Sequence, residues 1–401
     1  MRLMRTEYLN KLISFRDKHL VKVVTGVRRC GKSTLLEIYR DHLAASGVSS
    51  EQIISVNLED FDLRDLHDPA ALHSYVKQRL IPGKMNYVFI DEVQHCGQFP
   101  AVIDSLYLRS DTDIYLTGSN AYMLSGEIAT LLSGRYVEIR MLPLSFREYA
   151  QAMGGEAALS RTYLSYVQNG SFPYALELLS DKSALRDYLE GVYNTIVIKD
   201  IAARKRIQDV MMLESITRFV FDSIGSPLST KKITDTMTSM SRKIDVKTVE
   251  RYLEGLTESF VMYRCPRWNI RGKQLLKTQE KYYAVDMGLR GVLLGSRGTD
   301  VGHSLENIVY LELLRRGYEV YTGKLDNTEV DFVTMGVQGQ SYIQVAASVR
   351  DEATLSRELA PLQRIGDQYA KLILTLDEDP EADYNGIRRI NALEWLMGYV
   401  K

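Results

Sequence analysis

Residues 26–33 have the composition and spacing of a phosphate-binding loop. They read Gly26-Val27-Arg28-Arg29-Cys30-Gly31-Lys32-Ser33, which matches G-x-x-x-x-G-K-[ST], and they lie between an expected strand at 20–25 and an expected helix at 33–43. Glycines let backbone N–H groups turn toward a phosphate, and a helix that begins near Lys32 points its positive end there. Lys32 would contact the β- and γ-phosphates, and Ser33 would supply a hydroxyl to Mg²⁺. The alternative is a chance glycine turn.

A pair of carboxylates follows an apolar run about 60 residues later. Tyr87-Val88-Phe89-Ile90 reads as a buried strand, and Asp91 and Glu92 come directly after it. Ligands of parallel sheets bind at the carboxyl ends of the strands. We therefore expect Asp91 to hold the Mg²⁺ shell and Glu92 to orient or deprotonate an attacking water. Two solvated acids after a strand are the alternative.

Two further positions could complete such a site. Ser119 and Asn120 follow the apolar run 114–117, and either side chain could hold the attacking water. Both residue types are also preferred helix N-caps, so a capping role is equally compatible with the sequence. Arg135, in Ser133-Gly134-Arg135, precedes the expected strand 136–140 and could reach the γ-phosphate in a neighbouring subunit. A surface ion pair is the alternative for Arg135.

The order of apolar runs predicts several domains. Strands are expected at 20–25, 52–58, 87–90, 114–117 and 136–140, and they alternate with helices, which predicts βαβ units and a parallel sheet. Residues 156–205 read as helices. Three helices (213–224, 229–237 and 245–260) and two strand-like runs (260–263 and 281–285) then describe a winged helix-turn-helix. Glycines at 288, 291, 295 and 298 predict a linker, and the last hundred residues again mix helices with strands.

Together these motifs resemble a family of bacterial and archaeal AAA-type ATPases. In that family a P-loop core precedes a winged helix and a C-terminal domain related to PD-(D/E)XK nucleases. The resemblance is carried by residues 26–34, Asp91-Glu92-Val93-Gln94, Leu116-Thr117-Gly118-Ser119, 133–135, Gly170-Ser171-Phe172-Pro173, Leu305-Glu306-Asn307-Ile308-Val309-Tyr310 and Glu329-Val330-Asp331-Phe332-Val333. It covers nearly the whole chain.

The resemblance implies an α/β fold with four parts. These are an AAA-type P-loop ATPase core at 1–155 with a parallel sheet, a helical lid at 156–205, a winged helix-turn-helix at 206–290, and a restriction-endonuclease-like α/β domain at 300–401. ATP and Mg²⁺ are the implied cofactors. Thr34 would join residues 26–33 in binding the nucleotide, Pro173 in the lid would contact the adenine, and residues 5–8 would cover the other side of the base. The family also places its arginine finger where Arg135 stands.

The nuclease-like domain lacks part of the expected metal site. Such nucleases use two carboxylates and a lysine. Glu306 on the first helix and Asp331 on the second strand are candidates, but the position of E-x-K holds Gln344-Val345-Ala346. Gln344 is a neutral ligand at best and Ala346 has no charge. We expect an inactive fold kept for DNA or subunit contact, with solvated acids as the alternative reading of Glu306 and Asp331.

A basic stretch follows the three expected helices. No acidic residue interrupts the cations of this stretch, and two aromatics, Tyr263 and Trp268, are interleaved with them: Arg264, Arg267, Arg271, Lys273 and Lys277. Cations and aromatics on a wing suit contact with DNA phosphates and stacking on bases. The alternatives are a solvated face or a surface that contacts protein.

Composition limits the functions that remain. The chain has 401 residues with 50 basic and 51 acidic side chains, so DNA binding by the whole surface is excluded and only local patches remain. No apolar run approaches the length of a membrane span, the N-terminus lacks a signal-peptide core, and three cysteines form no disulfide framework, so a cytoplasmic protein is expected. We expect a Mg-ATP-dependent ATPase, a homo-oligomeric ring with a hexamer as one arrangement, that acts on DNA. The alternatives are a nucleotide-dependent signalling switch that binds proteins and an ATP-regulated nuclease.

Overall fold

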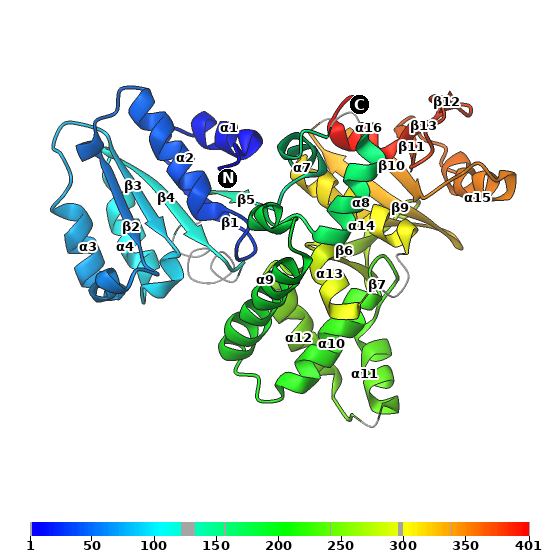
Figure 1. Ribbon diagram of the computed structural model, residues 1–401, viewed down its shortest axis with the longest axis horizontal. Coiled ribbons are helices and arrows are strands. Elements are labelled where there is room, and N and C mark those ends of the chain that lie inside the picture. Colours follow the sequence, from blue (N-terminus) through cyan, green and yellow to red (C-terminus); the bar gives the residue numbers. More distant parts are fainter. Residues whose placement is uncertain are drawn as a thin grey trace. The chain divides into compact units, whose positions relative to one another are not determined.

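The chain forms two compact units in the computed structural model, which describes residues 2–121, 132, 134–155, 158–240, 242–295, 300–337 and 339–400. One unit comprises Met1–Met141 with Glu258–Phe260, and the other comprises Leu142–Thr257 with Val261–Lys401. The elements of the first unit (Figure 1, blue to cyan) are α1 (Thr6–Ser14), β1 (Val21–Thr25), α2 (Lys32–Ala45), β2 (Ile53–Asn57), α3 (Pro69–Lys77), β3 (Asn86–Asp91), α4 (Phe99–Tyr107), β4 (Thr112–Gly118) and β5 (Tyr136–Arg140).

The sheet of the first unit is parallel throughout, as the sequence predicts. Its strand order is β2-β3-β4-β1-β5. Thr25 at the end of β1 lies opposite Gly118 of β4, and Asn57 of β2 lies opposite Asp91 of β3. The carboxyl ends of the strands therefore meet at one edge, which is the edge where the phosphate loop leaves β1.

Helices cover both faces of this sheet (Figure 1). On one face, α3 and α4 pack in a core with alternate strand residues that include Val21, Val88 and Leu116. On the other face, Tyr39 of α2 contacts Phe89 and Tyr115, with ring centroids 6.1 and 5.0 Å apart. Burial on both faces explains why β1 and β4 are buried along their whole length and read as continuous apolar runs.

A buried ion pair crosses the sheet between β1 and β4. The ammonium of Lys22 contacts the carboxylate of Asp113, and both side chains are buried. Burial lowers the pKa of Lys22 and raises that of Asp113. The hydroxyl of Tyr115 donates to Asp113 at 2.7 Å and the backbone N–H of Asp17 donates at 2.9 Å, and these bonds offset the desolvation of the charge.

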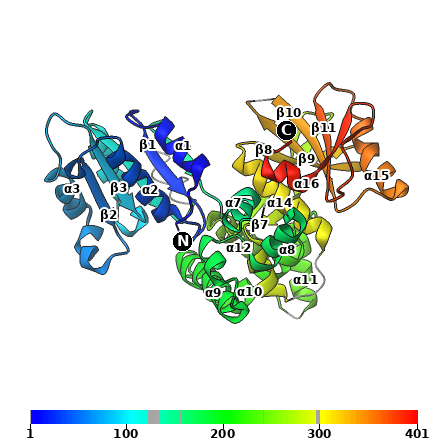
Figure 2. The same ribbon diagram turned by 45° about the horizontal axis from the view of Figure 1, so that its top comes forward.

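The second unit begins with helices and ends with a mixed sheet (Figure 2). Its helices are α7 (Phe146–Ala152), α8 (Leu159–Asn169), α9 (Lys182–Asn194) with a π-helical continuation (Thr195–Ala202), α10 (Val210–Asp222), α11 (Thr230–Ser239), α12 (Val246–Glu258), α13 (Met287–Leu294), α14 (Val301–Arg315), α15 (Glu352–Gln363) and α16 (Ala392–Met397). Its strands are β6 (Met262–Asn269), β7 (Gln274–Ala284), β8 (Glu319–Leu325), β9 (Thr328–Gly336), β10 (Gly339–Ala346), β11 (Ala370–Thr375), β12 (Ala382–Asp383) and β13 (Ile387–Asn391).

The hairpin β6–β7 forms the end of this sheet. The strand order is β12-β13-β11-β10-β9-β8-β6-β7, and β6 pairs in parallel with β8 through residues 267–269. The order of α10, α11 and α12 followed by an antiparallel pair is that expected for a winged helix, and Leu228 adds a bridge to Glu280 of β7. The hairpin is therefore shared by the three helices and the C-terminal sheet.

Two sequence predictions about this unit are wrong in detail. The strands of the hairpin are longer than expected, so Arg264, Arg267 and Trp268 lie on β6 and not in a wing loop. The expected linker at 288–298 contains α13, which Asp286 caps by accepting a hydrogen bond from Leu289 N at 2.8 Å. Gly288 packs so closely that a Cβ would lie 2.7 Å from the Cα of Gly170. Gly288 therefore allows close packing of α13, whereas the sequence alone suggested a turn.

Two expectations from composition can be compared with the structure. Cys30, Cys96 and Cys265 are all buried free thiols. Within the described residues, no helix is both long enough and apolar enough to cross a bilayer.

Candidate functional site

The phosphate loop connects the end of β1 to the first turn of α2. Gly26 has φ +153°, and a Cβ there would lie 2.1 Å from the carbonyl oxygen of Met141. Gly31 has φ +101°, in the region that glycine adopts readily, and α2 begins directly after it at Lys32. The positive end of α2 therefore lies directly after the loop, where backbone N–H groups of a helix start can bind an anion.

The side chain of Lys32 lies between this loop and the acids from β3. It is 4% exposed, and its Nζ donates to the carbonyl oxygens of Gly26 at 3.2 Å and Val27 at 3.4 Å. Nζ also lies 3.5 Å from Oε1 of Glu92. The structure therefore brings together the two predicted residues that would act on opposite sides of a γ-phosphate.

Thr117 holds both acids of β3 in place. Its Oγ1 donates to the carboxylate of Asp91 and accepts from the backbone N–H of Glu92 at 2.8 Å. Glu92 has φ +51°, a conformation that is costly for a residue with a Cβ and that clusters at functional sites. Sequence reasoning named Ser119 and Asn120 on this strand end and missed Thr117, whose role depends on the pairing of β3 with β4.

The carboxylate of Glu92 is held in its ionised form. Burial raises its pKa, but the nearby Lys32 ammonium and a 2.5 Å hydrogen bond from Nε2 of Gln94 outweigh burial, so the pKa is lowered. Nε2 of Gln94 also lies 3.4 Å from Oγ of Ser119, which is buried. The predicted residue Ser119 thus contacts Gln94, and its own hydrogen bond to Glu92 also lowers the pKa of that carboxyl.

Gln94 offers an acceptor beside this carboxylate. Its Oε1 is buried and has no hydrogen-bond partner among the described residues. An ionised Glu92 accepts only from the N–H side of the amide, so the amide oxygen must face away from it. An acceptor next to Glu92 is suited to orient a water molecule. In the sequence, Gln94 stands out only as part of the motif Asp91-Glu92-Val93-Gln94, which predicts no role for it.

The oxygen donors near the loop fit a magnesium ion. Ser33, in the first turn of α2, is exposed, and Asp91, at the end of β3, is partly exposed. Hydroxyl and carboxylate oxygens are the ligands that Mg²⁺ takes from proteins while it keeps several waters. Thr34 follows Ser33 in the same turn. The set of donors is therefore the one that the sequence predicts for Mg²⁺ with bound phosphates.

Arginines hold the phosphate loop from outside. The guanidinium of the buried Arg5, which precedes α1, donates to the carbonyl oxygen of Cys30 at 3.0 Å. Arg28 forms an ion pair of 2.8 Å with Glu59. Arg29 has φ +68°, which completes the turn before Gly31. The expected segment 5–8 thus contacts the loop, while its contact with a base stays a prediction.

Arg135 lies at the opposite edge of the sheet. It precedes β5, whose first residue is paired with Val21, the first residue of β1, whereas the phosphate loop follows the last residue of β1. A five-residue strand spans about 16 Å, so Arg135 does not reach the phosphates of its own loop. It forms an ion pair of 2.8 Å with Asp104 of α4, the surface pair that the sequence analysis named as its alternative. Ser133 lies outside the described residues.

Pro173 and the basic hairpin belong to the second unit. Pro173 begins a short 3₁₀ helix, Pro173–Leu178, and its role toward adenine stays a prediction. On the hairpin, Arg264 pairs with Glu280 at 3.6 Å and Arg267 donates to Gln279 at 2.7 Å. Trp268 packs against Tyr321 and the core of the C-terminal sheet, so its face is less available for stacking than a wing residue would be.

The turn of the hairpin carries two exposed cations. Arg271 is 66% exposed and pairs with Asp326 at 2.9 Å. Lys273 is exposed and has φ +48°. Lys277 lies on β7, and its side chain is outside the described part of the structure.

A lysine from the hairpin lies inside the carboxylate cluster of the C-terminal sheet. Nζ of Lys281 lies 2.9 Å from Glu306, 2.8 Å from Glu329 and 3.7 Å from Asp331. Burial opposes its charge, but these carboxylates outweigh burial and raise the pKa of Lys281. Sequence reasoning found Glu306 and Asp331 but missed Lys281, because that lysine comes from β7 and not from the strand where a nuclease lysine is expected.

Gln344 is fully engaged in the same cluster. Its Oε1 accepts from the backbone N–H of Asp331 at 2.8 Å and its Nε2 donates to Glu358 at 2.7 Å. Burial and the neighbouring Glu306 raise the pKa of Asp331. Within the described chain, no group of three or more His, Cys, Asp or Glu side chains is arranged to hold a metal ion. In this arrangement the ammonium of Lys281 offsets part of the negative charge of the acids.

Comparisons with known proteins place this geometry in context. Residues 18–150 match the family described as an AAA domain, and residues 160–300 match a domain of unknown function (DUF8612). An uncharacterised protein of Haemophilus influenzae is 37% identical over 397 residues, which cover 98% of each chain. An uncharacterised protein of Methanocaldococcus jannaschii is 27% identical over 363 residues, 86% of this chain and 78% of that protein.

One solved structure shares the fold over most of the chain. A Walker-type ATPase of Pyrococcus abyssi has a TM-score of 0.52 with 15% identity, and the similarity covers 73% of this chain and 95% of that chain. Together with the AAA match it confirms the predicted AAA-type P-loop ATPase fold of the first unit. The winged helix and the nuclease-like domain stay predictions.

Replacing Lys281 should make stability depend on pH. In Lys281→Met three carboxylates lose their cation, and the pKa of Asp331, which is already raised in the native fold, rises further. Such acids destabilise the fold increasingly as pH rises through the unfolded pKa toward the folded one. We expect a loss of about 3–5 kcal/mol at pH 8 and a much smaller loss at pH 5, measured by denaturant unfolding.

The matched control is Arg271→Met, which removes an exposed ion pair. It should cost about 1 kcal/mol or less at either pH. Equal losses for Lys281→Met at pH 5 and pH 8 would show that the ammonium does not neutralise the cluster.

Proposed function

The chain belongs to the protein family of this Haemophilus influenzae relative, with an AAA-type P-loop ATPase domain at residues 18–150, and we propose that it hydrolyses Mg-ATP as an oligomer. The observation that carries the proposal is the approach of Lys32 to Glu92, 3.5 Å apart at the carboxyl edge of a parallel sheet. The lysine that would bind the phosphates and the carboxylate that would activate the water therefore lie next to each other.

Different residues of the site have different roles in phosphoryl transfer. The loop N–H groups and Lys32 hold the phosphates, while Mg²⁺, when bound through Ser33 and Asp91, neutralises charge on the phosphate oxygens. Glu92, kept ionised by Lys32 and Gln94, accepts a hydrogen bond or a proton from the attacking water. The buried Oε1 of Gln94 is a second acceptor that fixes the direction of that water.

In the proposed oligomer, a neighbouring subunit supplies a further cation to this site. Arg135 is 44% exposed and lies at the sheet edge away from its own phosphate loop. An arginine in that position serves catalysis only if it enters a neighbouring subunit's site, where it would stabilise the charge that develops on the γ-phosphate. A ring of identical subunits provides this arrangement at every site, because head-to-tail contacts close on themselves.

DNA contact is proposed for the turn of the hairpin β6–β7. Arg271 and Lys273 are exposed there, and the helices α10, α11 and α12 precede the hairpin in the order of a winged helix. Two cations in an exposed turn suit phosphate contact. The C-terminal sheet then supports the hairpin, and the ion pairs that Lys281 forms with its acids favour a structural role for that sheet over cleavage.

Glu92→Gln should separate binding from turnover. The amide keeps the shape of the side chain but cannot take a proton, so we expect the steady-state ATPase rate to fall by about 10²- to 10⁴-fold. Affinity for ATP, measured by titration calorimetry, should be unchanged or higher. The control is Glu37→Gln on the exposed surface of α2. A Glu92→Gln rate within threefold of the native rate would contradict the assignment of Glu92.

Arg135→Ala should lower turnover only where subunits meet. The native rate per subunit should rise with protein concentration, whereas the variant rate should not rise and should be about 10³-fold lower at concentrations where the native chain is oligomeric. Arg109→Ala, which also removes an exposed arginine paired with an acid, is the control. If Asp104→Ala lowers turnover as much as Arg135→Ala, the arginine acts only through its surface pair with Asp104.

The double variant Arg271→Gln/Lys273→Gln should weaken DNA binding in a salt-dependent way. Each lost phosphate contact reduces the slope of log K against log salt by about 0.9, so a decrease of about 2 is expected for duplex DNA. Arg357→Gln, an exposed arginine on α15, is the control. Absence of salt-dependent binding by the native chain would exclude DNA as the partner and favour a switch that binds protein.

A further inference from the structure

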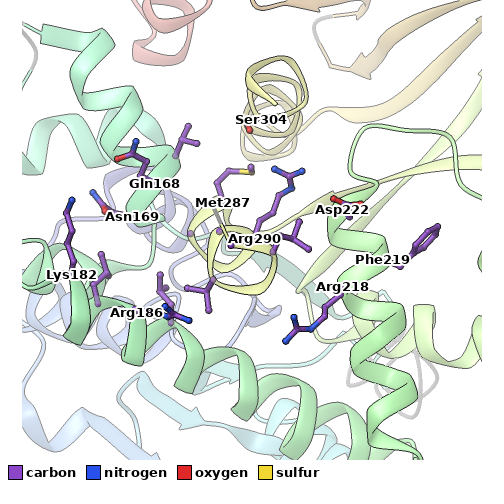
Figure 3. Close-up of a pocket in the computed structure, with 18 of the residues that line it drawn as sticks. Gln168, Asn169, Lys182, Arg186, Arg218, Phe219, Asp222, Met287, Arg290 and Ser304 are labelled. Carbon is purple, nitrogen blue, oxygen red and sulfur yellow. The ribbon is translucent and has the colours of Figure 1, made fainter. Parts of the chain in front are cut away.

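A cavity of about 990 Å³ lies within the second unit. It is bounded by the end of α8, by α9, α10, α11 and α13, and by the start of α14 (Figure 3). None of the residues assigned above to ATP, DNA or the carboxylate cluster lines it. Its volume is at the upper end of the range for small-molecule sites.

Cations outnumber acids four to one in its lining. Lys182 and Arg186 come from α9, Arg218 from α10 and Arg290 from α13, whereas Asp222 is the acid of the lining. Arg186 also pairs through Nε with Glu190, outside the lining, at 2.9 Å, and its Nη groups are not part of that bond. In Figure 3, Arg186 and Arg218 extend from α9 and α10 into the space below α13. The chain has a net charge of −1, yet cations from three helices line this one cavity. This excess of positive charge favours an anionic ligand.

The arginines keep most of their hydrogen-bonding capacity. Arg218 donates through Nη1 to the carbonyl oxygen of Leu293 at 3.1 Å, and Arg290 donates through Nε to that of Phe221 at 2.9 Å. Each bond uses one of five N–H donors and fixes the direction of the guanidinium. Among the described residues, the remaining N–H groups of both arginines have no acceptor. They can therefore form paired hydrogen bonds with a planar or tetrahedral oxyanion.

The deeper lining is apolar with one unsatisfied hydroxyl. Leu185, Leu189, Met237 and Met287 are buried side chains of the wall. Ser304, at the start of α14, is 2% exposed, and its Oγ is buried with no hydrogen-bond partner in the described structure. Figure 3 shows Met287 and Arg290 of α13 extending toward the helix that carries Ser304. A buried hydroxyl without a partner is costly and indicates a polar group that is still to be supplied.

We propose that this cavity binds a small organic phosphate, a phosphoryl group joined to an apolar or aromatic body. A phosphate dianion matches an excess of several cations better than a carboxylate does, and arginine forks fit its oxygens in pairs. The apolar body occupies the methionine- and leucine-lined wall, and a polar atom on it satisfies Ser304. Met side chains adapt to bodies of different shape, so the phosphoryl group carries most of the recognition.

Titration calorimetry on the full chain with three probes tests this proposal. The probes are AMP, octyl phosphate and inorganic phosphate, which separate an aromatic body, an alkyl body and the anion alone. We expect AMP or octyl phosphate to bind at least tenfold tighter than inorganic phosphate. Arg186→Gln and Arg218→Gln should each weaken that binding about tenfold, the loss of one charge-assisted contact. Arg161→Gln, an exposed arginine of α8 outside the cavity, should leave it unchanged.

The phosphate loop of the first unit is a competing site, and Lys32→Ala distinguishes the two. Binding that persists in Lys32→Ala and weakens in Arg186→Gln and Arg218→Gln supports the cavity as the site. Binding that is lost in Lys32→Ala and unchanged in the two arginine variants overturns the proposal, and so does the absence of binding by either organic phosphate. Failure of the ATPase predictions leaves this test intact, since its readout is binding alone.

Discussion

The alignment of three strand ends is the constraint on which the nucleotide site depends. β1 delivers the phosphate loop, β3 delivers Asp91 and Glu92, and β4 delivers Thr117 and Ser119, all at the carboxyl edge of one parallel sheet. Because the strands are in register there, Lys32 stands 3.5 Å from Glu92, and one threonine hydroxyl holds both acids. The buried pair of Lys22 and Asp113 links β1 to β4 across the same sheet.

Local motifs were predictable from the sequence, and contacts between distant segments were not. The phosphate loop, the acids of β3 and the parallel sheet follow from residue types that are adjacent in the chain. Thr117, Gln94 and Lys281 were missed because each acquires its role from a partner on another strand or turn. Gly288 was wrongly predicted to lie in a linker. The sequence alone does not distinguish a glycine that is needed for close helix packing from one that ends a helix.

The second unit shows why the near-zero net charge is not informative by itself. Cations of this unit occur in three different settings: exposed at the hairpin turn, buried among acids at Lys281, and lining a cavity. The exposed cations favour binding of a polyanion. The buried lysine offsets charge within the fold, and the cavity cations favour binding of a small anion. The role of a lysine or arginine therefore depends on its burial and on the number of acids beside it.

The central claim is that each ATPase site is completed by the arginine of a neighbouring subunit. Mixing two inactive variants, Glu92→Gln and Arg135→Ala, tests it most directly. In mixed oligomers an Arg135→Ala subunit keeps an intact phosphate loop and Glu92, and a Glu92→Gln neighbour supplies the arginine. The account predicts that the mixture hydrolyses ATP well above the sum of the separate variants, whereas a rate equal to that sum would contradict it.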